Sequence, residues 1–257
     1  MAEPEPFVTL WIGPTLSRVE RACLRSWLRC GHKVALYCYR AVEGVPDGVE
    51  LRDAAAILAE DRIIRHRGGS VALFSNWFRY ELMRRDLGIW VDTDQYLLAP
   101  IPSPRPHLFG WQEADRMGTG VLRIPSGSPI LQGLLELFEQ RKVPFWLSRK
   151  QQLAAHWRLW RTGRTGLSSM PWGSAGPQAL TALARRHGLA GEAVAPSVFY
   201  PIPYTEAEWL RDPARDLAEL IASDSVGFHL WNEVIKSWKD EPATPGSFLA
   251  RLHAEGA

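Results

Sequence analysis

Residues 74–101, FSNWFRYELMRRDLGIWVDTDQYLLAPI, combine a helical pattern, a short apolar run and two aspartates two positions apart. Apolar side chains recur at helical spacing through residues 70–86, and this pattern ends near Gly88. The apolar run that follows predicts a buried strand leading into Asp92 and Asp94. We therefore expect the two carboxylates at the end of a strand of an α/β sheet, where such sheets bind their ligands.

Apolar runs near the N-terminus predict neighbouring strands of the same sheet. Residues 7–12 (FVTLWI) and 34–39 (VALYCY) favour buried strands, and residues 17–28 between them have an amphipathic helical pattern. Strand, helix and strand in this order predict a parallel βαβ unit. Later in the chain we expect strands at 107–112, 120–124, 198–200 and 226–231, and helices at 129–140, 146–164, 176–187 and 246–254. The whole predicts one α/β domain with a mixed, mostly parallel central sheet and a more helical C-terminal half.

The composition is that of an ordinary globular protein. Of 257 residues, 46% are hydrophobic and 23% are charged, and the net charge of +2 does not favour a nucleic-acid partner. No run approaches the roughly 20 apolar residues of a membrane helix. The acidic N-terminus lacks the basic start and apolar run of a secretory signal. The three cysteines, Cys23, Cys30 and Cys38, then fit reduced thiols in a cytoplasmic protein.

Asp92 and Asp94 form the first candidate site. In an extended backbone, residues two apart point to the same side, so the two carboxylates would repel each other unless a cation lay between them. Mn²⁺ and Mg²⁺ prefer carboxylate and phosphate oxygens, so the pair predicts a metal site that also binds a phosphate group. The alternative is a solvated turn in which one aspartate caps the next element.

The helix predicted at 70–86 carries polar residues on an apolar background. Asn76 and Tyr80 lie on one stripe of this helix, and Arg79 lies on the adjoining stripe. An arginine on a largely buried helix needs an anionic partner. A structural salt bridge would satisfy it, and so would a phosphate, a sugar or an aspartate in an adjacent cleft.

Residues 74–101 resemble the signature of sugar transferases with a DXD motif, the family of α-1,4-galactosyltransferase-like and yeast mannosyltransferase-like enzymes. The matching positions are Ser75, Asn76, Arg79, Tyr80, Gly88, Trp90, Asp92 and Asp94. The sequence departs from the family at Asn76, where many members carry aspartate. It departs again at residues 86–88, where Asp-Leu-Gly replaces a glycine pair.

This resemblance implies a metal-dependent glycosyltransferase with a GT-A-like, Rossmann-related fold over residues 1–257. Residues 1–125 would bind the nucleotide sugar, a UDP-sugar in preference to a GDP-sugar. Residues 126–257 would bind the acceptor, which is a glycan, a lipid-linked compound or another hydroxyl compound. Transfer with retention of the anomeric configuration is the outcome that the resemblance implies.

The resemblance also implies roles for individual residues of the helix and the motif. Asp94 would ligate Mn²⁺ or Mg²⁺, and Asp92 would contact the metal, the sugar or the ribose. Asn76, Arg79 and Tyr80 would approach the donor sugar, with Arg79 counted among the catalytic residues.

Residues 227–238, GFHLWNEVIKSW, are the second informative run. In similar transferases a C-terminal histidine completes the metal shell and a downstream lysine reaches the diphosphate. The resemblance thus implies that His229 is a metal ligand and that Asn232 and Lys236 bind the nucleotide sugar, with Trp231 on the acceptor side. The alternative is a core histidine beside a surface lysine.

Five further residues are weaker candidates. Trp11 and Tyr39 end the first two predicted strands and could stack on the nucleotide base, although each could equally be a core residue. Glu113 is a candidate nucleophile for a retaining reaction, which otherwise needs a front-face route assisted by the leaving phosphate. Trp172 and Gly176 lie in a loop before a predicted helix that we expect to face the acceptor.

Residues 145–164, FWLSRKQQLAAHWRLWRTGR, interleave tryptophans with arginines and a lysine. An ordinary amphipathic helix explains this pattern. Contact with a membrane surface is the alternative, and it would suit a lipid-linked acceptor at the inner face of the membrane.

Two other functions compete with sugar transfer. A phosphatase-like hydrolase also uses Asp-x-Asp after a strand, but it needs the pair near the N-terminus and a later acidic cluster, and this sequence has neither. A non-catalytic protein that binds nucleotide sugar or glycan would keep the site without turnover.

Overall fold

A five-stranded sheet forms the centre of the computed structural model, which describes residues 5–65, 69–101 and 105–257. In spatial order its strands are β3 (Val49–Asp53), β2 (Val34–Cys38), β1 (Phe7–Trp11), β4 (Ile89–Val91) and β8 (Val121–Leu122). The first four are parallel, and β8 runs antiparallel to β4. The predicted α/β class with a mixed, mostly parallel sheet is therefore confirmed. β3 was not predicted, because its half-exposed sequence VELRD lacks an apolar run.

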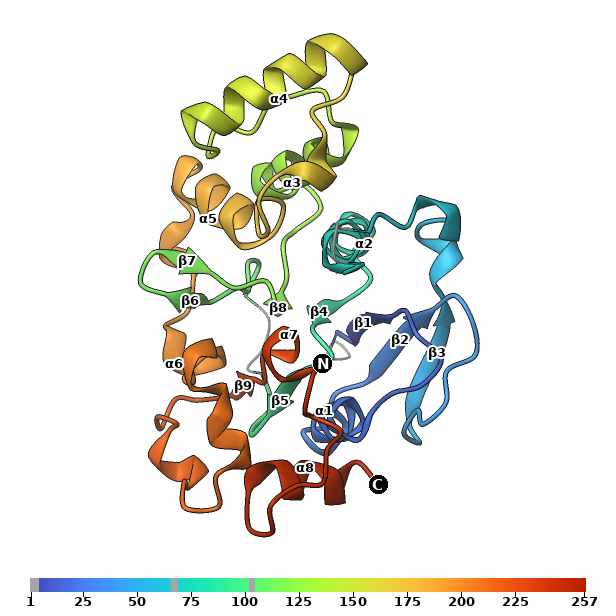
Figure 1. Cartoon of the computed structure of the whole chain (residues 1–257), viewed down its shortest axis with the longest axis vertical. Helices are drawn as coiled ribbons and strands as arrows, with labels where there is room; N and C mark the ends of the chain where they lie inside the picture. The colour runs from blue at the N-terminus through green and yellow to red at the C-terminus, as the bar shows by residue number, and fades with distance from the viewer. Residues whose placement is uncertain (1–4, 66–68, 102–104) are drawn as a thin grey trace.

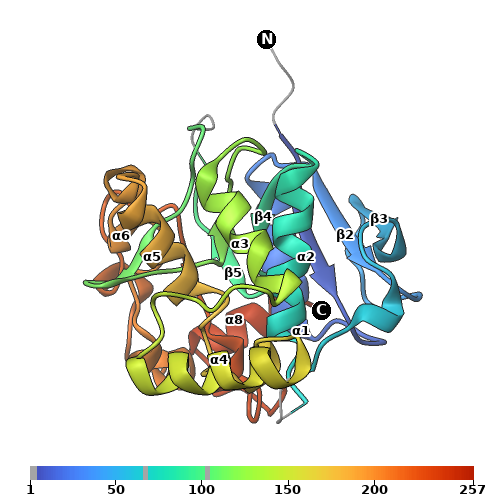
Figure 2. The same cartoon turned by 90° about the horizontal axis from the view of Figure 1, so that it is seen from above.

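The two faces of the sheet pack against different helices, as the alternation of side chains along β1 requires. Val8 belongs to the core beneath α2 (Ala72–Arg84), whereas Phe7 belongs to the core beneath α1 (Arg18–Arg29). Figure 1 shows these two helices on opposite sides of the sheet, and Figure 2 shows α2 lying along it. Ser17 begins α1 with a capping box that includes Glu20. Both helices are confirmed predictions.

Two short antiparallel pairs extend the fold beyond the central sheet. β5 (Gln95–Leu97) pairs with β9 (Gly227–His229), and β6 (Trp111–Glu113) pairs with β7 (Arg116–Met117). The predicted strands around 107–112, 120–124 and 226–231 are thus present but shorter. Since β4 and β5 are separated only by residues 92–94, the Asp-x-Asp motif joins the large sheet to the small one.

The second half of the chain is mostly helical, as predicted. Its helices are α3 (Pro129–Glu139), α4 (Arg149–Thr162), α5 (Pro177–Arg186), α6 (Pro196–Phe199), α7 (Asn232–Ile235) and α8 (Phe248–Glu255). The strand predicted at 198–200 is wrong. Pro196 occupies the first position of α6, where a missing N–H costs nothing, and the Tyr200 N–H donates to its carbonyl at 2.7 Å. Within the described ranges, no helix is both long and apolar enough to cross a bilayer.

Candidate active site

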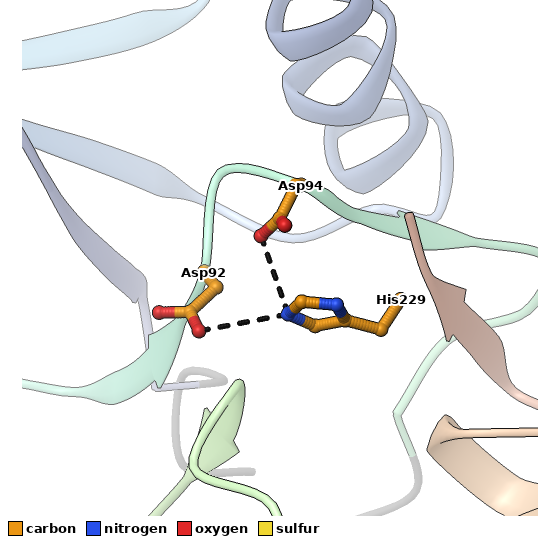
Figure 3. Close-up of side chains that lie close together, drawn as sticks. All are labelled: Asp92, Asp94 and His229. Atoms are coloured by element: carbon orange, nitrogen blue, oxygen red, sulfur yellow. Dashed lines mark ion pairs between the residues drawn. The ribbon is translucent and has the colours of Figure 1, made fainter. Parts of the chain in front are cut away.

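The motif Asp92-Thr93-Asp94 forms a tight turn between β4 and β5. The Gln95 N–H donates to the Asp92 carbonyl at 2.9 Å, and the Asp92 N–H donates to the Gly120 carbonyl at 2.7 Å. The expectation of an extended backbone through the motif is therefore wrong. The turn nevertheless brings the two carboxylates to the same side, facing β9 (Figure 3).

The pairing of β5 with β9 delivers His229 to the aspartates. Gln95 lies opposite His229 in the register, and the Leu230 N–H donates to the Asp94 carbonyl at 2.8 Å. The imidazole Nε2 then lies 3.3 Å from Asp94 Oδ1 and 3.7 Å from Asp92 Oδ2 (Figure 3). Nδ1 accepts a hydrogen bond from the Trp231 N–H at 3.0 Å, so Nε2 is the nitrogen that faces the carboxylates.

These three side chains fit a divalent cation. One ligand atom from each of Asp92, Asp94 and His229 lies within 4.8 Å of the other two. Two carboxylates and one imidazole form a donor set that Mn²⁺ or Mg²⁺ accepts, and such ions complete their coordination with water or phosphate oxygens. The geometry thus brings together the three residues that the sequence assigned to metal binding.

Arg79 finds its anionic partner inside this cluster. Its Nη2 lies 3.1 Å from Asp92 Oδ1, and the guanidinium is centred 4.5 Å from the Trp90 ring. The same Asp92 oxygen accepts a hydrogen bond from Trp90 Nε1 at 2.7 Å. Arg79 also donates to the hydroxyl of Ser75 at 3.1 Å and to the carbonyl of Thr119. The sequence left open whether the partner of Arg79 would be a structural salt bridge or an aspartate in the adjacent cleft. Asp92 is both, because it pairs with Arg79 and also lines the cavity.

The charges within the cluster shift one another's ionisation. Burial opposes ionisation of Asp92, but Arg79 and His229 outweigh it and hold the pKa of Asp92 below its ordinary value. The pKa of Asp94 is raised by burial and by the charge of Asp92. Burial lowers the pKa of His229, but the nearby carboxylates of Asp94 and Asp92 raise it by more, so the pKa of His229 lies above its ordinary value. This negative pair beside an imidazole is an environment that attracts a cation.

A cavity of about 820 Å³ opens over the cluster. Ten of the predicted site residues line it, namely Trp11, Asn76, Arg79, Asp92, Asp94, Trp172, His229, Trp231, Asn232 and Lys236. The Nε1 of Trp11 is buried there without a hydrogen-bond partner in the described structure. A cavity of this size accommodates a nucleotide sugar.

Four predicted site residues do not line the cavity. Tyr80 is wholly buried and donates to the Ala175 carbonyl at 2.8 Å, so it supports the loop before α5. The hydroxyl of Tyr39 donates to the Leu58 carbonyl at 2.7 Å. Glu113 lies beside Arg116, 3.9 Å away, in the β6–β7 hairpin.

Gly176 is the fourth of these residues, and it acts through a neighbour. A Cβ at this position would lie 2.9 Å from Asn76 Nδ2, so the absence of a side chain leaves room for Asn76 in the cavity wall. The contact is steric, and the acceptor-binding role of Gly176 stays a prediction.

The sequence reasoning missed a second set of groups behind the metal ligands. The backbone N–H of Asn232 donates to Asp94 Oδ2 at 2.7 Å, and its side-chain oxygen accepts from Lys239 Nζ at 2.8 Å. Lys239 also pairs with Glu20, which is wholly buried in α1. Lys236, by contrast, is exposed and pairs with Glu233. Nothing in the sequence distinguishes the buried lysine from the exposed one, because burial depends on the packing of α1.

The chain was compared with known families and with solved structures. Residues 168–255 match the family described as "Alpha 1,4-glycosyltransferase conserved region". The solved structure titled "PaToxG Glycosyltransferase" is similar, with 13% sequence identity, a TM-score of 0.47, and coverage of 74% of this chain and 72% of that chain. Comparison with curated protein sequences gave no match. The family match contains His229, Asn232 and Lys236 but not the Asp-x-Asp motif, so it confirms the predicted resemblance from a separate part of the chain.

Proposed function

We propose that this protein, whose residues 168–255 match an α-1,4-glycosyltransferase conserved region, moves a sugar from a nucleoside-diphosphate sugar to an acceptor hydroxyl. The donor is a UDP-sugar in preference to a GDP-sugar, and the acceptor is a glycan or a lipid-linked compound. The observation that carries the proposal is the convergence of Asp92, Asp94 and His229 beside Arg79 in one large cavity.

Asp92, Asp94 and His229 would hold Mn²⁺ or Mg²⁺. A divalent ion there supplies positive charge to the diphosphate, whose negative charge grows as the bond to the sugar breaks. The side chains of Arg79 and Asn76 reach the same cavity and would orient the donor sugar. Lys236 at the cavity rim would add charge for the diphosphate, on release from its exposed pair with Glu233.

The cavity supports a front-face route to retention. Among the described lining residues, the carboxylates are those of Asp92, Asp94 and Glu233, and the first two belong to the metal site. Glu233 is exposed and paired, and Glu113 lies outside the lining, so neither is placed as a nucleophile. We propose that the acceptor oxygen bonds to the anomeric carbon on the face that the diphosphate oxygen leaves. The acceptor proton then passes to the departing phosphate.

The two halves of the chain would divide the substrates. Residues 1–125 contribute the Asp-x-Asp turn and Trp11, which lines the cavity and would contact the nucleotide. Residues 126–257 contribute Trp172 and Trp231, whose ring faces suit a sugar acceptor. We place the reaction in the cytoplasm.

The test is donor hydrolysis and calorimetric binding across UDP- and GDP-sugars, with Mn²⁺ and with EDTA. One donor should bind and hydrolyse slowly only with metal, and Asp94→Asn should reduce hydrolysis about 10³-fold. Asp115→Asn, which removes an exposed carboxylate outside the cavity, is the matched control and should behave as the unchanged protein. Binding of a nucleotide sugar with no hydrolysis of it and no transfer to any acceptor would favour the non-catalytic alternative. Absence of any nucleotide-sugar binding by folded protein would refute the proposal.

A further inference from the structure

Charge is distributed very unevenly along this chain. Residues 140–191 contain nine lysines and arginines and no aspartate or glutamate. The rest of the chain therefore carries 21 of the 30 basic residues against all 28 acidic ones. The small net charge of the protein hides a strongly basic segment, and a segment of one sign attracts partners of the opposite sign.

The helix at the centre of this segment, α4, exposes an apolar stripe. Leu153, Trp157 and Trp160 are 71%, 56% and 83% exposed, and Ala155 is the one residue of α4 that is buried. With 3.6 residues per turn, the three exposed residues fall within an arc of about 60°. Large apolar side chains this exposed on one stripe indicate a surface that meets something else.

Basic residues border the stripe on both sides. At the same helical spacing Arg149 falls at one edge, and Lys150 and Arg161 fall at the other. Among the described residues, Arg149, Lys150 and Arg161 form no ion pair, and the Arg161 guanidinium lies over the Trp157 ring, 5.2 Å from the ring centre. An apolar centre with cationic edges is the pattern of a helix that lies in the interface of a bilayer.

The position of α4 leaves this face open and keeps it near the active site. Figures 1 and 2 show α4 at one end of the molecule, as its outermost helix. A hollow of about 360 Å³ next to it is lined by residues of α4 and by residues 168–171. Pro171 lines both this hollow and the large cavity, so the helix and the cavity are neighbours.

We propose that the exposed face of α4 docks on a bilayer that contains anionic lipids. The indoles of Trp157 and Trp160 would enter the headgroup region, where aromatic rings with one polar N–H are stable. Arg149, Lys150 and Arg161 would pair with anionic headgroups. Docking in this orientation brings the neighbouring cavity close to the membrane surface. The proposal concerns this surface alone and does not depend on the transfer reaction.

The experiment is co-sedimentation of the full chain with vesicles, without donor or metal. Vesicles of phosphatidylcholine and phosphatidylserine should bind the protein, vesicles of phosphatidylcholine alone should bind it far less, and added salt should weaken binding. The triple variant Arg149→Gln, Lys150→Gln, Arg161→Gln should lower the partition coefficient about 100-fold. Trp160→Ala should lower it roughly tenfold.

Matched controls lie on other surfaces. Arg40→Gln with Arg84→Gln removes exposed arginines elsewhere, and Leu51→Ser removes an apolar side chain that is 49% exposed on β3. Both controls should bind vesicles as the unchanged protein does. Equal loss in the controls, or no binding to anionic vesicles, would overturn the proposal. A concentration-dependent dimer abolished by Trp160→Ala would also overturn it, and would assign the face to a second copy of the chain. Donor hydrolysis can succeed or fail independently of these outcomes.

Discussion

The charged side chains of the Asp92–His229 cluster are buried and paired, whereas those of the α4 face are exposed. In the cluster, Asp92 lies within 4 Å of both Arg79 and His229, His229 lies within 4 Å of Asp94, and all four side chains are largely shielded from water. On α4, Arg149 and its neighbours extend into solvent. Buried charges must be paired because an isolated one is costly, so the fold dictates where they lie. Exposed charges cost the fold little, so their arrangement reflects what they meet outside.

The largest effect on this comparison is expected from replacing Arg79, the buried arginine of the cluster. Arg79→Met would leave Asp92 without its buried partner, and we expect about 3 kcal/mol lower stability. Donor hydrolysis should fall about 10³-fold, because the carboxylate loses its position and the donor loses a cationic contact. Urea denaturation and steady-state hydrolysis measure the two effects. Arg79→Lys should keep part of the stability, because it keeps a positive charge beside Asp92. Full activity in Arg79→Met would contradict a role for Arg79 in the active site.

Lys239 is buried and Lys236 is exposed, so replacing each in turn compares the two environments. Lys239→Met leaves the wholly buried Glu20 without its cation and removes the hydrogen bond that holds the side chain of Asn232. The backbone N–H of Asn232 donates to Asp94, so a shift of Asn232 would disturb that ligand. We expect a loss of about 3 kcal/mol in stability and roughly tenfold weaker Mn²⁺ binding. Thermal denaturation and calorimetry measure both.

Lys236→Met is the control for this pair, because Lys236 forms an exposed ion pair with Glu233. Its stability should change by less than about 0.5 kcal/mol. Equal destabilisation by the two substitutions would contradict the different roles that their burial assigns to them.

A smaller effect is expected from crowding His229 without touching any charge. A Cβ at Gly120 would lie 2.9 Å from His229 Cδ2 and 3.1 Å from the Tyr200 hydroxyl oxygen. Gly120→Ala should therefore displace the imidazole, weaken Mn²⁺ binding roughly tenfold and cost about 1 kcal/mol of stability. Gly127→Ala, where a Cβ would meet nothing within 4 Å, is the control. Unchanged metal affinity in Gly120→Ala would argue against His229 as a ligand.

The smallest effect on the fold is expected on α4. Trp160 is 83% exposed, so Trp160→Ala should change stability by less than about 0.5 kcal/mol and leave donor hydrolysis in solution unchanged. Thermal denaturation and hydrolysis without vesicles check this. A large loss of stability would show that the indole packs against the protein and would weaken the contrast with the cluster.

The sequence predicted the helices and strands better than the contacts between them. The helix over Ala72–Arg84 and the strand before Asp92 were foreseen, because their apolar spacing reports local burial directly. The strand predicted at 198–200 failed because short apolar runs do not distinguish strand from helix. Tyr39 and Tyr80 were expected in the cavity, yet their hydroxyls are used by backbone carbonyls of the scaffold.

What the sequence determined by itself was local. The helical and strand periods, the Asp-x-Asp spacing and the acid-free segment at 140–191 depend only on the order of residues and on their chemistry. The tertiary structure decided which distant groups meet. The β5–β9 register brings His229 to Asp94, and the packing of α1 buries Glu20 against Lys239, 219 positions away. These contacts are long-range, and no periodicity along the chain encodes them, because they arise only when separate elements bury their apolar faces together.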